Sequence, residues 1–331
     1  MLSQNETDAG MTKARRSFTA LKEYMNGCIV GQTELVDRLL IALLADGHLL
    51  VEGAPGLAKT KAIKKLSEAI EGDDQRIQFT PDLLPSDITG SDIYRPETGV
   101  FQFQPGPIFH NLILADEINR APAKVQSALL EAMAERQVTV GGKTYRLPKL
   151  FMVMATQNPI EQEGTYPLPE AQLDRFLMYV RIDQPDAEAE RRILRLVRDE
   201  ALAGDVIPAL EVMPQSRVFE ARREALDVHL SPALEEYIVQ LVMATRHPEA
   251  YGEKFARWVA FGASPRGTIA LDRCARARTW LAGRDYVLPE DIHAVVHDVL
   301  RHRIILTFEA EAEGVTPDSF LDVLLSRVPL P

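Results

Sequence analysis

The sequence predicts an α/β domain, built on a mostly parallel sheet with helices on both faces, followed by a smaller all-helical domain. Up to about residue 202, short apolar runs alternate with amphipathic helical patterns, as in sheets whose parallel strands are joined by helices. Residues 203–216 interrupt this pattern with one glycine and two prolines, and only helical patterns follow. We therefore expect a disordered tail over 1–14, an αβα core over 15–204 and a helical domain over 205–331.

The composition is that of a soluble globular protein. The 331 residues are 46% apolar and 26% charged, with a net charge of −11, which argues against a surface that coats nucleic acid. The two cysteines, Cys28 and Cys274, lie far apart and indicate thiols in a reducing compartment. No apolar run approaches the roughly 20 residues of a membrane helix, and no signal peptide is evident. We expect a cytoplasmic protein without a membrane span.

A glycine-containing loop joins the first predicted strand, near residues 48–52, to a helix over 61–70. Strand, loop and helix in this order predict a phosphate-binding loop, in which backbone N–H groups and the helix N-terminus face a triphosphate. Its lysine would reach the terminal phosphates and its threonine hydroxyl would hold Mg²⁺. An ordinary Gly/Pro turn is the alternative. The loop consists of Gly53, Ala54, Pro55, Gly56, Leu57, Ala58, Lys59 and Thr60.

Ala58 occupies a position where glycine usually stands in such loops. A methyl group is tolerated there if the residue has helical torsions, because only a positive φ excludes it. We therefore expect helical torsions at Ala58.

A second apolar strand, over residues 112–117, ends in two adjacent carboxylates, Asp116 and Glu117. In a nucleotide site Asp116 would hold the Mg²⁺ shell, and Glu117 would orient and activate the attacking water. A strand ending in Asp-Glu is common by itself. Together with the loop, at a spacing that suits neighbouring strands, it predicts the second half of an ATP site.

Further strands are expected near residues 76–79, 150–156 and 177–182. In such a sheet the ligand site lies at the carboxyl ends of the strands. The loop, the two carboxylates and Asn158 all fall at these ends, so we expect them to meet there.

A short turn precedes the loop, between helical patterns over residues 15–28 and 33–45. It contains Val30, Gly31 and Gln32. This turn, residues 29–32, would either close over the adenine ring of a nucleotide or simply join the two helices. So short a segment does not decide between these two roles.

Two hairpins are expected within the core. Residues 90–104 would turn at 96–99, and residues 137–148 would turn at a Gly-Gly pair. Phe101 and Phe103 share one face of the first hairpin and would either anchor it on the core or grip a substrate; anchoring is the more common role. After the linker, helices are predicted near residues 217–227, 231–246, 264–282, 289–303 and 317–327.

With these motifs in place, the chain resembles the AAA+ ATPases and, within them, the MoxR family, from residue 16 to the end. Alanine before the loop lysine is usual in that family, and both hairpins fall where it carries inserts. The segments similar to its Walker A, Walker B, sensor 1, arginine-finger and sensor 2 motifs are residues 53–60, 114–121, 155–159, 173–176 and 262–267.

The resemblance implies roles for three further residues. Asn158 would help to hold the attacking water. Arg175 would be an arginine finger that reaches the γ-phosphate bound by a neighbouring subunit; its alternative is a salt bridge to Asp174 or another acid. Arg266 belongs to the expected helical domain, residues 205–331, which is called the lid in this family. From there it would bind phosphate, so that ATP draws lid and core together.

The function that the resemblance implies is Mg²⁺-dependent ATP hydrolysis by a ring, expected to be a hexamer, that remodels, activates or inserts metal into a client protein. A partner with a von Willebrand factor A-type domain is a further implication, and no nucleic acid is expected. Two alternatives stay open: a nucleic-acid motor of the same superfamily, and a scaffold that binds ATP but scarcely hydrolyses it.

Overall fold

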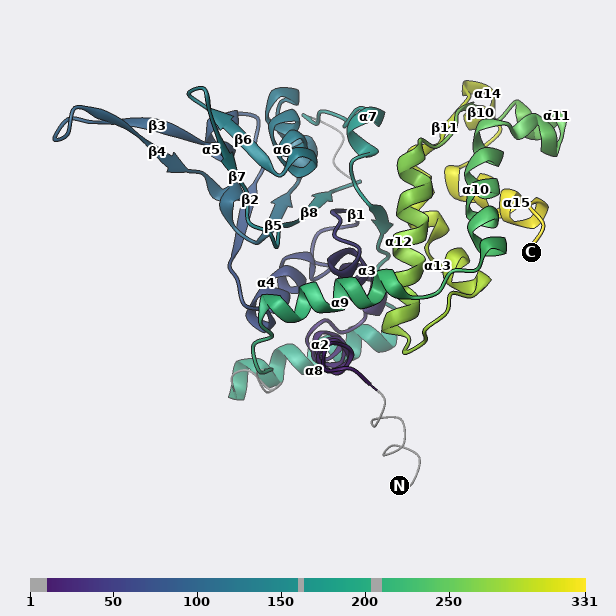
Figure 1. Cartoon of the computed structure of the whole chain (residues 1–331), viewed down its shortest axis with the longest axis horizontal. Helices are drawn as coiled ribbons and strands as arrows, with labels where there is room; N and C mark the ends of the chain where they lie inside the picture. The colour runs from purple at the N-terminus through teal and green to yellow at the C-terminus, as the bar shows by residue number, and fades with distance from the viewer. Residues whose placement is uncertain (1–10, 160–163, 204–209) are drawn as a thin grey trace, which may run out of the picture.

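The computed structural model describes residues 11–159, 164–203 and 210–331. A central sheet with helices on both sides occupies one part of the molecule and a group of C-terminal helices the other (Figure 1). The expected boundary between residues 204 and 205, and most of the expected N-terminal tail, lie outside the described residues. No helix within the described ranges is both long and apolar enough to cross a bilayer.

The central sheet has five strands in the order β2-β5-β8-β1-β9, and every neighbouring pair is parallel. The predicted parallel sheet is therefore confirmed. Because all strands run the same way, their carboxyl ends meet at one edge of the sheet. The strands are β1 (Leu49–Glu52), β2 (Asp74–Gln78), β5 (Leu112–Asp116), β8 (Met152–Gln157) and β9 (Met178–Arg181).

Both faces of the sheet are covered by helices, which is why its strands read as nearly continuous apolar runs. Side chains alternate between the faces: Leu49 and Val51 pack in the cluster formed with α2, α3 and α4, whereas Leu50 packs in the cluster formed with α6. The helices of the core are α2 (Lys13–Cys28), α3 (Thr33–Leu44), α4 (Lys59–Ala69), α5 (Pro85–Thr89), α6 (Ala123–Glu135), α7 (Glu170–Leu173) and α8 (Ala187–Ala203), with 3-10 turns η1 (Pro107–Phe109) and η2 (Ile118–Arg120).

Two elements differ from the expectation. Helix α2 begins at Lys13, because the Thr12 hydroxyl accepts a hydrogen bond from the Arg15 N–H at 3.1 Å and caps the helix. The expected tail is therefore too long by two residues. Helix α5 was not predicted, because a helix of five residues is too short to give a helical period in the sequence.

Both predicted hairpins are present and project together from the core, away from the C-terminal helices (Figure 1). One consists of β3 (Gly90–Arg95) and β4 (Val100–Pro105), the other of β6 (Gln137–Val140) and β7 (Lys143–Arg146). Phe103 stacks on Tyr145 of the second hairpin at 3.9 Å between ring centroids. Phe101, in contrast, is 69% exposed. Anchoring is thus the role of Phe103 but not of Phe101.

The C-terminal part has the five predicted helices, and several short elements that were not expected. The predicted helical domain is confirmed, and β10 and β11 add a small antiparallel ladder to it. Strands of two or three residues give no period in a sequence. The elements are α9 (Gln215–Asp227), α10 (Pro232–Arg246), η3 (Pro248–Tyr251), α11 (Glu253–Ala256), β10 (Val259–Phe261), α12 (Pro265–Leu281), α13 (Pro289–Leu300), η4 (Arg301–Arg303), β11 (Ile305–Leu306), α14 (Phe308–Ala312) and α15 (Pro317–Arg327).

The apolar core continues from the αβα part into these helices. Phe18 of α2 meets Trp280 of α12 edge to face at 5.4 Å between centroids. Helix α9 packs against α2, α3 and α12, and in Figure 1 it runs across α3 toward the lid. The lid is therefore packed firmly against the core of its own chain.

Candidate nucleotide-binding site

The predicted loop leaves β1 at Glu52 and enters α4 at Lys59. Gly53 passes close to the residue that follows β9: a Cβ built on it would lie 2.4 Å from Ile182 Cγ1. Gly56 has a φ of +86°, a conformation that favours glycine. Both glycines are therefore required by the path of the loop.

Ala58 does not have the expected helical torsions. Its φ of 57° and ψ of 16° place it in the left-handed region, at a cost of about 1–2 kcal/mol for a residue with a side chain. Ala58 is also the N-cap of α4 and has no side chain that could cap the helix. The first N–H groups of α4 are thus suited to an anion such as phosphate.

Lys59 lies between the loop and the carboxylates of β5. Its Nζ donates to the Gly53 carbonyl at 2.6 Å. Burial lowers the pKa of Lys59, and the nearby Asp116 and Glu117 oppose that shift. The ammonium group is held where it would meet the terminal phosphates of a nucleotide in the loop.

The two predicted carboxylates are held by different groups. Asp116 accepts the Thr156 hydroxyl at 2.7 Å through Oδ1 and the Arg76 guanidinium at 2.7 Å through Oδ2. Glu117 Oε2 accepts from Gln78 Nε2 at 2.9 Å and lies 3.0 Å from Arg120 Nε. Each carboxylate therefore has a fixed orientation.

A cavity of about 400 Å³ brings the predicted residues together. The loop lines it from Pro55 through Thr60, together with Asp116, Glu117 and Asn158. Gly53 and Ala54 do not line it. Thr60 and Asp116 offer a hydroxyl and a carboxylate, the hard oxygen donors that Mg²⁺ prefers, so the residues present fit that ion.

Four residues that hold the carboxylates were not predicted from the sequence: Arg76, Gln78, Arg120 and Thr156. A signal existed for two of them. Arg76 and Gln78 flank the buried Ile77 on β2, and Gln78 pairs in register with Asp116 of β5. Two polar residues on either side of one apolar residue, on a strand next to the one that ends in Asp116, would have identified Arg76 and Gln78 as candidates for the site.

The turn before the loop also reaches the site. Val30 and Gln32 line an apolar cavity of about 250 Å³, together with Gly56, Leu57 and Ala58 of the loop. Gly31, with a φ of +82°, lines an adjoining cavity with Gln32. An apolar cavity beside a phosphate loop suits a flat base such as adenine.

Arg175 and Arg266 lie elsewhere, together. They line a separate cavity of about 290 Å³ that also contains Arg136, Arg273 and Arg303, and neither lines the loop cavity. Arg175 Nη1 donates to the Leu130 carbonyl at 2.7 Å, rather than pairing with Asp174. The expectation that Arg266 binds phosphate from the lid stays a prediction; in this structure its side chain lies beside Asp174 and does not line the loop cavity.

The parallel sheet, the phosphate loop, the paired carboxylates and the helical lid define an AAA+ ATPase. The family model described as "ATPase family associated with various cellular activities (AAA)" matches residues 48–178, and the one described as "AAA lid domain" matches residues 256–323.

Comparison with known proteins gives the particular family. The chain is 47% identical to "Chaperone MoxR1" of Mycobacterium tuberculosis, over 92% of this chain and 79% of that protein. It is 34% identical to "Protein MoxR" of Paracoccus denitrificans, over 98% of this chain and 99% of that one. A crystal structure from Cytophaga hutchinsonii matches with a TM-score of 0.89 and 46% identity, covering 99% of this chain and 98% of the other. The chain belongs to the MoxR family of chaperone-like AAA+ ATPases.

Proposed function

We propose that this chain is a Mg²⁺-dependent ATPase whose complete active site forms between two subunits. The observation that carries the proposal is the loop cavity, in which Lys59, Asp116, Glu117 and Asn158 face one space. The N–H groups at the start of α4 and the Lys59 ammonium bind the β- and γ-phosphates. Val30 and Gln32 hold the base in the adjoining apolar cavity.

Glu117 is the group that activates water. It takes a proton from the water molecule whose oxygen attacks the γ-phosphorus, and the bond from that phosphorus to the β–γ bridging oxygen breaks to release ADP. Gln78 and Arg120 keep the Glu117 carboxylate in place, and Asn158 orients the water. Mg²⁺, held by Thr60 and Asp116, would neutralise phosphate charge.

The loop cavity lacks one component for this chemistry. Among the described cations that line it, Lys61 pairs with Glu200 and Arg76 with Asp116, which leaves Lys59 to face the phosphates. Phosphoryl transfer is strongly accelerated by an added arginine. We infer that Arg175, joined by Arg266, enters the loop cavity of the neighbouring subunit.

A contact in which one surface of a subunit meets a different surface of the next forms a ring when the rotation between subunits closes, and an open filament when it does not. We propose a hexamer that binds ATP, hydrolyses it and thereby remodels a client protein. The relative named a chaperone supports that role. A protein with a von Willebrand factor A-type domain is the proposed partner in trans. If Glu117→Gln, used as bait in a pull-down, enriches no such protein, the proposed partner is wrong.

Hydrolysis is tested with Glu117→Gln. We expect the rate of phosphate release to fall by about 10²–10⁴, with ATP affinity retained, because Glu117 acts on water rather than on the phosphates. Chelation of Mg²⁺ should stop the wild-type reaction. The matched control is Glu131→Gln, an exposed carboxylate on α6, which should keep the wild-type rate. Equal rates for the wild type and Glu117→Gln would contradict the proposal.

A further inference from the structure

Turn η4 in the lid binds the core segment that carries the proposed finger. The Arg303 side chain is 2% exposed. Its Nε donates to Asp174 Oδ1 at 2.9 Å, Nη2 to the Phe176 carbonyl at 2.6 Å and Nη1 to the Leu177 carbonyl at 3.2 Å. A planar guanidinium with several fixed donors defines the position of the groups it binds. Arg303 therefore fixes both the side chain of Asp174 and the backbone that follows it.

Asp174 is held from a second lid element as well. The Ser264 hydroxyl donates to Asp174 Oδ2 at 2.8 Å, and Arg266 Nη1 lies 3.7 Å from the same oxygen. Asp174 directly precedes Arg175. One carboxylate thus joins the two arginines of the separate cavity: it is the backbone neighbour of Arg175 and the side-chain neighbour of Arg266.

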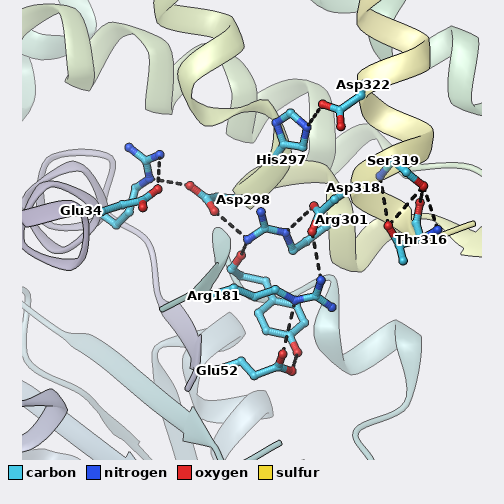
Figure 2. A network of polar contacts seen from close by, with 12 residues as sticks. Glu34, Glu52, Arg181, His297, Asp298, Arg301, Thr316, Asp318, Ser319 and Asp322 are labelled. Carbon is cyan, nitrogen blue, oxygen red and sulfur yellow. Dashed lines mark hydrogen bonds and ion pairs between the residues drawn. The ribbon is translucent and has the colours of Figure 1, made fainter. Parts of the chain in front are cut away.

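The same turn also reaches toward the loop of its own chain, as Figure 2 shows. Arg301 donates to Asp318 Oδ1 at 2.9 Å, and Asp318 Oδ2 accepts from Arg181 at 3.0 Å. Arg181 Nε lies 3.3 Å from Glu52 Oε1, at the end of the strand that enters the loop. Arg301 also donates to the Tyr179 carbonyl at 2.8 Å. Turn η4 is thus bound to the segment that contains Asp174 and Arg175. Through ion pairs it is also bound to Glu52, at the end of β1, where the phosphate-binding loop begins.

We propose that Arg303 is a positioning residue: through Asp174 it sets the geometry in which Arg175 and Arg266 enter the neighbouring subunit's site. The proposal rests on the shared site proposed above. Removing a buried ionic pair in favour of apolar groups is often neutral for stability, so stability alone does not account for the Arg303–Asp174 pair. Its consequence is that the lid of a chain acts on the nucleotide of the next subunit.

The test is complementation between variants in mixed assemblies. In Arg303→Lys the charge remains but the fork of donors is lost, and a displacement of about 1 Å at a reacting centre costs about 10²-fold in rate. We therefore expect the ATPase rate to fall by about 10²-fold in assemblies that contain only Arg303→Lys. Mixing it with Glu117→Gln should restore activity, because Glu117→Gln supplies an intact finger to a site with an intact base. In a ring assembled at random from equal amounts of the two variants, about one site in four has both an intact Glu117 and a correctly positioned Arg175 from the neighbour.

Mixing Arg303→Lys with Arg175→Ala should restore nothing, since both lack a working finger. Asp174→Asn, which keeps the shape of the side chain, is the second variant and should follow the same pattern with a smaller loss. Arg284→Gln is the matched control: Arg284 Nη1 donates to the buried Asp291 within the lid at 2.7 Å, and its loss should leave the rate per subunit unchanged.

Two outcomes would overturn the inference, and they can be told apart. If Arg175→Ala and Glu117→Gln complement each other but Arg303→Lys and Asp174→Asn are not rescued by Glu117→Gln, then these residues serve their own chain's site or fold. If Arg175→Ala and Glu117→Gln also fail to complement, the shared site itself is wrong, and the positioning role falls with it.

Discussion

The loop cavity differs in its chemistry from the second cavity, which Arg175 and Arg266 line and which we call the arginine cavity. The loop cavity presents the carboxylates Asp116 and Glu117 beside the half-buried ammonium group of Lys59 and a helix start without a side-chain cap. Its two other cations, Lys61 and Arg76, are paired with carboxylates. The arginine cavity is lined by five guanidinium groups and two carboxylates: Arg136, Arg175, Arg266, Arg273, Arg303, Asp46 and Asp174.

The groups that fix the charged side chains also differ between the two cavities. In the loop cavity, cations and an amide from β2 and η2 hold the two carboxylates. In the arginine cavity, backbone carbonyls, Asp46 and Asp174 hold guanidinium groups. A single chain therefore carries a cavity suited to bind phosphate and activate water, and a separate group of cations suited to a neighbour's phosphate. Each cavity offers groups that the other lacks, and this complementarity is the basis of the proposed shared site.

The largest expected effect comes from removing the finger. Arg175→Ala should lower the ATPase rate by about 10³ or more, while the affinity of the chain for ATP stays near that of the wild type, because Arg175 does not line the loop cavity. Rate is measured by phosphate release and affinity by equilibrium titration. A loss of affinity as large as the loss of rate would place Arg175 in its own chain's site and remove the distinction between the cavities.

Low pH should lower the free energy of unfolding through His48, a buried residue of the arginine cavity. His48 lines that cavity, and burial, aided by Arg136, lowers its pKa to about 4. Its Nδ1 accepts the Val153 N–H at 3.0 Å, a bond that needs the neutral ring. The unfolded chain, with a pKa near 6.5, binds the proton first, so the contribution of His48 is complete above about pH 6.5 and is lost as the pH falls toward 4.

At pH 5 we expect the free energy of unfolding to be about 2 kcal/mol lower than at pH 7.5 from His48 alone. His302, whose pKa burial also lowers, adds a loss of the same sign. Denaturant unfolding at the two pH values measures the effect. His48→Gln should be less stable at pH 7.5 but less sensitive to acid, while the exposed His247→Gln should keep the wild-type pH dependence. An unchanged dependence in His48→Gln would contradict the prediction.

The smallest effect concerns the loop cavity. The Arg76 guanidinium occupies one side of Asp116, where it competes with a divalent cation for Oδ2. Since Arg76 is half-exposed, its ion pair is worth at most about 1 kcal/mol. Arg76→Gln should therefore lower the Mg²⁺ concentration for half-maximal ATPase by no more than about fivefold. Arg120→Gln, which contacts Glu117 instead, should leave it unchanged. A rise in the Mg²⁺ requirement of Arg76→Gln would show that Arg76 assists the metal.

Much of the loop cavity could be predicted from the sequence, because its groups follow apolar strands in a fixed context. The runs before Gly53, before Asp116 and before Asn158 identified three strands, and the parallel sheet brought their carboxyl ends together. The left-handed torsions of Ala58 were not predictable, because composition does not reveal φ. Thr156 was missed because a single polar residue on a strand is usually solvated or structural.

The arginine cavity was much harder to predict. Its residues come from the turn between α3 and β1, the end of α6, the segment after α7, and two lid elements. No local sequence pattern relates these segments. The position of Arg266 depends on which side of the sheet receives the lid, and that is decided by tertiary packing such as Phe18 against Trp280. Family resemblance pointed to Arg175 and Arg266, but only the fold placed them side by side and away from their own loop.

The shared site is tested most directly by measuring the ATPase rate per subunit against protein concentration, for the wild type and for Arg175→Ala mixed with Glu117→Gln. If the site forms between subunits, the wild-type rate per subunit rises with concentration as assemblies form. The two variants, each nearly inactive alone, regain activity when mixed. A rate independent of concentration, with no recovery in the mixture, would mean that each chain carries a self-contained site and would contradict the account.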